Sequence, residues 1–105
     1  MSYRIANWPD KAPAEKVWLT FKYKRGLAPG ESVTSVAMIV TLKGGVDASP
    51  ALILDGVPVL LADGRVMQRI KDGIHLAAYM VLCKATTSTG QILVLAGVIP
   101  VREIA

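Results

Sequence analysis

Residues 72–101 read DGIHLAAYMVLCKATTSTGQILVLAGVIPV, and this stretch decides the fold. It contains two apolar runs, Ile74–Ala85 and Gln91–Val101, joined by the turn-forming cluster Thr86–Gly90. Runs rich in Val, Ile, Leu and Tyr with a short Thr/Ser/Gly link between them are typical of a β-hairpin. Each run is shorter than the about 20 residues of a membrane-spanning helix, so we predict two strands and no membrane partner.

Both faces of this predicted hairpin are apolar. In each run the side chains at even positions and those at odd positions are mostly hydrophobic, in a chain of 105 residues that is 52% hydrophobic. An antiparallel sheet usually has one apolar and one polar face, and a two-layer sandwich covers only one face of each sheet. We therefore expect a neighbouring chain to cover the second face, with the protein's own loops as the alternative.

Five further strand candidates precede the hairpin. They are, in order, Lys16–Lys24, Ser32–Leu42, Ala51–Leu54, Val57–Leu61 and Arg65–Ile70. An Asp-Gly pair, which favours tight hairpins, follows each of the last three. Seven short strands without a convincing amphipathic helix predict an all-β fold, a seven-stranded immunoglobulin-like or fibronectin-like β-sandwich over residues 15–105.

Two residues of the hairpin have expected structural roles. Tyr79 lies in the penultimate predicted strand, where such sandwiches often carry a tyrosine whose hydroxyl bonds to the backbone. Cys83 is the single cysteine, so no intrachain disulfide can form, and a reducing compartment is indicated. We interpret Cys83 as a small core hydrophobe rather than a reactive thiol. The Cys–Trp–Cys pattern of immunoglobulins is absent, so any similarity is one of architecture.

Residues 1–14 are expected to form an extended N-terminal arm because two prolines restrict the backbone there. Trp8 either anchors in a pocket of a partner protein or folds back on its own sandwich. The start of the chain has no apolar segment after its charges, so no secretory signal is expected. The candidate partner-binding residues of the arm are Tyr3, Arg4, Trp8, Pro9 and Lys11.

The charge of the chain is concentrated at its front. The formal net charge is +4, and residues 1–25 hold six basic and two acidic residues. Trp18, Lys22 and Lys24 occupy the outer face of the first strand, opposite its apolar positions, and complete the candidate partner-binding set. Lysines on such a strand protect a sheet edge or contact a protein. Nucleic acid is disfavoured, because the strand has one aromatic and no Arg/Gly-rich loop.

No residue pattern indicates catalysis, a metal site or a cofactor. His75 is the single histidine and lies in an apolar run, and one His and one Cys do not make a typical zinc site. The aspartates stand mostly beside glycine in turns, where turn hydrogen bonding explains them. Phosphate-binding loops, GxSxG and HExxH are absent. We expect no enzyme activity.

Four segments carry a family resemblance: NWPDKAPAEKVWLTFKY, LAPGES, DASP and YMVLCKATTSTGQILVLAGVIPV. From about Trp8 to Arg102, the chain resembles the bacteriophage fiber-tail adaptor protein family of small virion proteins. The resemblance implies a non-enzymatic structural component of the tail that joins tail fibres, or a neighbouring ring, to the tail in multiple copies. Its partners would be tail tube, ring or fibre proteins and copies of itself, in a virion assembled in the host cytoplasm.

Two other roles stay open at this point. One is a receptor- or carbohydrate-binding sandwich, although the chain has few aromatic residues for a binding platform. The other is a head–tail junction or capsid decoration protein whose basic first strand meets DNA phosphates, with binding that weakens steeply as salt rises. The family has no motif that assigns contact residues, so the eight candidates above depend on the residues alone.

Overall fold

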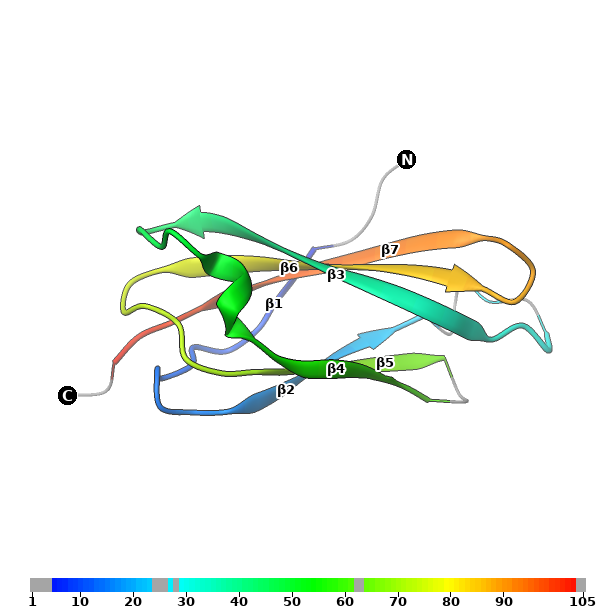
Figure 1. The fold of residues 1–105 in the computed structure, drawn as a ribbon, viewed down its shortest axis with the longest axis horizontal. Coiled ribbons are helices and arrows are strands. Elements are labelled where there is room, and N and C mark those ends of the chain that lie inside the picture. Colours follow the sequence, from blue (N-terminus) through cyan, green and yellow to red (C-terminus); the bar gives the residue numbers. More distant parts are fainter. Residues whose placement is uncertain (1–4, 24–26, 28, 62–63, 104–105) are drawn as a thin grey trace.

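The computed structural model describes residues 5–23, 27, 29–61 and 64–103, with side chains from residue 8 onward. Figure 1 shows a two-layer all-β fold, which confirms the expected class. The strands are β1 (Ile5–Asn7), β2 (Val17–Lys22), β3 (Val33–Gly44), β4 (Leu54–Leu60), β5 (Arg65–Ile70), β6 (Ala78–Thr87) and β7 (Ile92–Pro100). A single-turn 3₁₀ helix, η2 (Pro50–Ile53), joins β3 to β4. No helix in this described part is long and apolar enough to cross a membrane.

The two layers are a four-stranded and a three-stranded sheet. The large sheet has the order β1-β7-β6-β3, and the small sheet has the order β2-β5-β4. Neighbouring strands are antiparallel except β1, which runs parallel to β7. The expected hairpin is β6–β7, paired from Ala78–Pro100 to Thr86–Ile92. Because this hairpin lies between β1 and β3, it forms the centre of the large sheet.

Six of the seven expected strands are present, and the expected strand Ala51–Leu54 is wrong. Its first three residues belong to η2, because Pro50 occupies an early helical position where its missing N–H costs nothing. The expected Asp55-Gly56 turn is a bulge within β4, where Gly56 adopts a φ of 78°. The buried Gln68 amide donates to the Gly56 carbonyl at 3.1 Å and so satisfies the bulged backbone.

The core lies between the two sheets. β6 supplies its centre with Tyr79, Val81, Cys83 and Ala85, none of which is measurably exposed. β2 contributes Leu19 and Phe21 from the small sheet, as its period-two pattern predicted. Cys83 is a free, buried cysteine, which confirms its interpretation as a core residue.

Tyr79 confirms the expected hydroxyl-to-backbone bond. Its fully buried side chain accepts a hydrogen bond from the Ile74 N–H at 2.9 Å and donates one to Asp47 Oδ2 at 2.7 Å. Asp47 Oδ1 in turn accepts from the Ser49 N–H at 2.9 Å. One tyrosine hydroxyl therefore ties the loop after β3 to the loop before β6.

The Thr/Ser/Gly turn between β6 and β7 folds over a buried carboxylate. Glu31 accepts hydrogen bonds from the hydroxyls of Thr87 and Thr89, and Thr87 Oγ1 accepts the Gln91 N–H at 3.1 Å. Gly90 closes the turn with a φ of 90°. These bonds satisfy a carboxylate that is only 8% exposed, and they explain why hydroxyl residues fill the turn.

Trp8 folds back on its own sandwich, which decides between the two alternatives for this residue. Its backbone N–H donates to the Val98 carbonyl at 3.0 Å, and its indole ring meets Phe21 edge-on, with centroids 5.5 Å apart. The same ring lies directly over Gly97, where an added Cβ would approach ring atoms to 2.4 Å. The described part of the expected arm is thus bound to β7 and to the core.

Gly97→Ala should lower the free energy of unfolding by about 1–3 kcal/mol, because the added methyl displaces the Trp8 ring. Gly44→Ala is the matched control: its added Cβ meets only Ala78 Cβ, at 3.9 Å. Urea unfolding followed by tryptophan fluorescence measures both. Equal stability of the two variants would contradict the packing of Trp8 on Gly97.

Buried ionisable groups of the core favour their neutral forms. Burial raises the pKa of Tyr23, and the hydrogen bond from its hydroxyl to the Cys83 carbonyl, 2.5 Å long, adds to the shift. Burial also raises the pKa of the Cys83 thiol and of Tyr79. In the unfolded chain these groups ionise near about pH 8.5 for cysteine and about pH 10 for tyrosine. Stability is therefore fully present below those values and is lost as the pH rises, because the unfolded state releases protons first.

Tyr23→Phe should cost about 1–2 kcal/mol of stability at pH 8 through the lost hydrogen bond. The difference in free energy of unfolding between wild type and variant should shrink above about pH 10. Only the wild type then loses stability through ionisation of the Tyr23 phenol in the unfolded state. Unfolding free energies measured in urea at pH 8 and pH 10.5 test this. A difference that stays constant with pH would show that Tyr23 ionises equally in both states.

Candidate functional site

The outer side of the large sheet is apolar. We call it the apolar face and define it by Ile39, Met80, Leu82, Val94 and Val98. The strand register aligns Ile39 with Leu82 and Ala96, Thr41 with Met80 and Val98, and Ala37 with Lys84 and Val94. Ile39 is 50% exposed, and Lys84 is the one charged residue in these three rows. The prediction that both faces of the β6–β7 hairpin are apolar is confirmed.

The outer side of the small sheet is basic. We call it the basic face and define it by Trp18, Lys22, Arg65, Met67 and Arg69. The register aligns Trp18 with Arg69 and Lys22 with Arg65. Arg69 Nε donates to Asp55 Oδ2 at 2.9 Å, and its guanidinium lies 5.5 Å from the Trp18 ring centroid. The half-exposed Trp18 is therefore held in place by a cation–π contact and remains available to a partner.

The structure brings together only part of the predicted partner-binding set. Trp18 and Lys22 share the basic face, while Pro9 is exposed elsewhere on the chain. Trp8 and Lys11 contact the protein's own sandwich instead. Tyr3, Arg4 and Lys24 lie outside the described residues. Sequence reasoning missed Arg65 and Arg69, although their period-two spacing with Met67 in a predicted strand was a usable signal.

Lys11 has an internal role because its side chain is 1% exposed. Its Nζ donates to the carbonyls of Ala12 at 2.9 Å and Asp72 at 2.5 Å. Its backbone bonds to Pro100 and Arg102 on either side of Val101, at 3.0 and 2.8 Å. Burial lowers the pKa of Lys11, and the nearby carboxylates of Asp72 and Glu15 oppose that shift. The residue fastens the N-terminal segment to the loop before β6.

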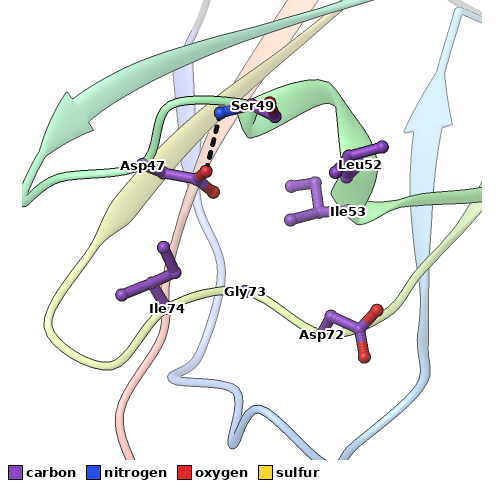
Figure 2. Close-up of a pocket in the computed structure, with 7 residues that line it drawn as sticks. All are labelled: Asp47, Ser49, Leu52, Ile53, Asp72, Gly73 and Ile74. Carbon is purple, nitrogen blue, oxygen red and sulfur yellow. Dashed lines mark hydrogen bonds between the residues drawn. The ribbon is translucent and has the colours of Figure 1, made fainter.

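A small pocket lies at one end of the sandwich, beside η2 (Figure 2). Its volume is about 250 Å³, and its lining residues are Asp47, Ser49, Leu52, Ile53, Asp72, Gly73 and Ile74. The Asp47 carboxylate is already engaged by Ser49 and Tyr79, and the lining contains no nucleophile paired with a base. The pocket therefore shows no arrangement for chemistry.

His75 has a structural contact rather than acidic neighbours that could form a metal site among the described residues. His75 is exposed, and its Nδ1 accepts the Glu103 N–H at 2.9 Å, as expected for a structural or surface histidine. Over residues 5–23, 27, 29–61 and 64–103, no cluster of three or more His, Cys, Asp or Glu side chains could hold a metal ion. The two sheet faces remain as candidate interaction surfaces of the described part of the chain.

Lys11→Met should lower the free energy of unfolding by about 1–3 kcal/mol, because the buried carbonyls of Ala12 and Asp72 lose their donor. Lys16→Met is the matched control, since Lys16 is exposed and the change should stay within about 0.5 kcal/mol. Chemical denaturation of both variants at pH 7 measures the difference. If Lys16→Met lowered the free energy of unfolding and Lys11→Met did not, the internal role of Lys11 would be refuted.

Comparison with known proteins gives one family. A family model described as podophage GP4 fiber-tail adaptor protein gp77 matches residues 11–100. The match covers β2 to β7 and therefore both sheet faces. No curated protein and no solved structure gave a significant match.

Proposed function

This chain belongs to the podophage GP4 fiber-tail adaptor family, and we propose that it is a non-enzymatic subunit that joins tail fibres, or a neighbouring ring, to the phage tail. We further propose that it is present in multiple copies in the virion and is assembled in the host cytoplasm. Its partners in this proposal are other tail proteins and copies of itself.

The apolar face is the observation that carries the proposal. Three neighbouring strands present Ile39, Leu82 and Val94 on the side of the sheet that faces away from the core. A contiguous apolar patch on a small domain marks an interaction surface, and obligate interfaces are more apolar than ordinary surface. An adaptor that stays attached within a particle needs such a permanent interface.

The basic face supplies a second, chemically different contact. Lys22, Arg65 and Arg69 carry positive charge there, and Asp55 offsets part of it. Head-to-tail assembly requires two different patches on each subunit. In this proposal the basic face meets an acidic surface of a neighbour, with Trp18 as its aromatic anchor.

The finer fold assignment also belongs to the proposal. In an immunoglobulin-type sandwich the third, sixth and seventh strands form one sheet and the second, fourth and fifth strands share the other. The orders β7-β6-β3 and β2-β5-β4 support that topology. We retain the division into an N-terminal segment, 1–14, and a sandwich, 15–105. The contact set becomes Pro9, Trp18 and Lys22, with Tyr3, Arg4 and Lys24 beyond the described residues.

Leu82→Glu should reduce the number of copies per particle at least about tenfold. The reason is that an unpaired carboxylate in an apolar interface costs more than the about 1.4 kcal/mol that corresponds to tenfold. The test supplies the variant to a phage that lacks this protein and counts copies in purified particles by quantitative mass spectrometry.

Leu52→Glu is the control for this experiment, because Leu52 is 71% exposed and lies in η2 rather than in a strand of either face. Circular dichroism of the purified variants verifies that each one folds. Wild-type incorporation of a folded Leu82→Glu variant would rule out the apolar face as an interface.

A further inference from the structure

The edge strand β3 presents unpaired backbone. β3 is the outermost strand of the large sheet and pairs on one side only, with β6. Between its register shifts it runs regularly from Ser35 to Leu42. Along this stretch alternate N–H and C=O groups point away from β6. They have no backbone partner among the residues that the structure describes.

The features that usually protect a sheet edge are missing from Ser35–Leu42. This stretch contains no charged residue and no proline, and its pairing with β6 is unbroken. The other edges differ: β1 has only three residues, β2 is bordered by Lys16 and Lys22, and β4 contains Pro58 and a register shift. Ser35–Leu42 of β3 is therefore the one long, regular and uncharged edge segment in the described part of the chain.

We propose that β3 pairs antiparallel with β3 of a second copy of this chain, across a two-fold axis. This pairing aligns Ser35–Leu42 of one copy with Ser35–Leu42 of the other along nearly its whole length. The other edge strands do not allow such pairing, because β1 is short and β2 and β4 are protected. It brings no like charges together, because Lys43 of each copy lies toward opposite ends of the paired strands. The inference deepens the proposed function by naming a contact between copies, and it rests on that function only for their presence in one particle.

The pairing has a defined geometry. Residues directly opposite in an antiparallel pair point to the same face, with Cα atoms about 4.5–5.5 Å apart. With the axis near the middle of Ser35–Leu42, Ile39 of one copy faces Ile39 or Ala37 of the other. The large sheets of the two copies then form one continuous sheet, and their apolar faces join into a single surface.

Sedimentation equilibrium of the purified chain over a concentration series tests the pairing. The wild type should form a reversible dimer, and Ile39→Lys should raise its dissociation constant at least about tenfold, because two lysines meet near the axis. Ile92→Lys is the matched control: Ile92 is 47% exposed on the same side of the sheet, but on β7. It should leave the dissociation constant unchanged within about twofold.

Oxidative cross-linking supplies a readout that does not depend on affinity. If Ile39 faces Ile39, the single variant Ile39→Cys should give a disulfide-linked dimer. If Ile39 faces Ala37, the double variant Ala37→Cys/Ile39→Cys should give it, because directly opposite Cα atoms lie within the about 4.4–6.8 Å that a disulfide spans. Ile92→Cys should give no disulfide-linked dimer, and the native Cys83 is too buried to react. A link in the single variant indicates Ile39 opposite Ile39, and a link only in the double variant indicates Ile39 opposite Ala37.

The outcomes separate this inference from the adaptor role. A wild type that stays monomeric at every concentration, with no cross-link in the single or the double cysteine variant, overturns self-pairing and leaves the β3 edge to a strand of another protein. If Ile39→Lys and Ile92→Lys raise the dissociation constant of the dimer equally, self-pairing through β3 is also overturned, because the copies would then associate through the sheet face. Loss of pairing with normal incorporation into particles would leave the adaptor role intact.

Discussion

The strand β6 has to satisfy two apolar faces at once, and the architecture follows from this constraint. On its inner side, Tyr79, Val81 and Cys83 exclude water completely and pack against the small sheet. On its outer side, Met80 and Leu82 extend an apolar surface onto β3 and β7. Among the residues that the structure describes, this two-layer fold has no third layer to cover that surface. The core therefore fixes where the exposed apolar surface lies.

Local sequence patterns predicted the parts of the fold that depend on local spacing. Period-two alternation located β2, and apolar runs rich in β-branched residues located β3 and the β6–β7 hairpin. The expected roles of Tyr79 and Cys83 came from the place of a tyrosine in such sandwiches and from the apolar character of a lone cysteine. The same reasoning failed at Ala51–Leu54, because a proline that starts a 3₁₀ turn outweighed the strand propensity of the next residues. It also misread Asp55-Gly56, since the bulge depends on the buried amide of Gln68 on the neighbouring strand β5.

The candidate site was predicted less completely because burial of a long side chain depends on distant segments. Lys11 resembles a surface lysine in the sequence, yet the Asp72 carbonyl and the backbone around Val101 enclose it. The Trp8 ring packs against Gly97, which is far away in the sequence, and no local sequence pattern connects the two residues. Arg65 and Arg69 were accessible to the same alternation argument that placed Trp18 and Lys22. The faces themselves were predictable, whereas the residues that fasten the N-terminal segment were not.

The parallel pairing of β1 with β7 has a mechanical consequence. Because the two strands point in the same direction, the chain enters the pair at one end through β1 and leaves it at the other end through β7. Tension applied to the two termini acts along the strands and loads their hydrogen bonds simultaneously, in shear. A hairpin pulled apart from its open end would instead break its inter-strand hydrogen bonds one after another. The bonds from Trp8 and Lys11 to the end of β7 lengthen this sheared contact, in a protein whose family connects fibres to a tail.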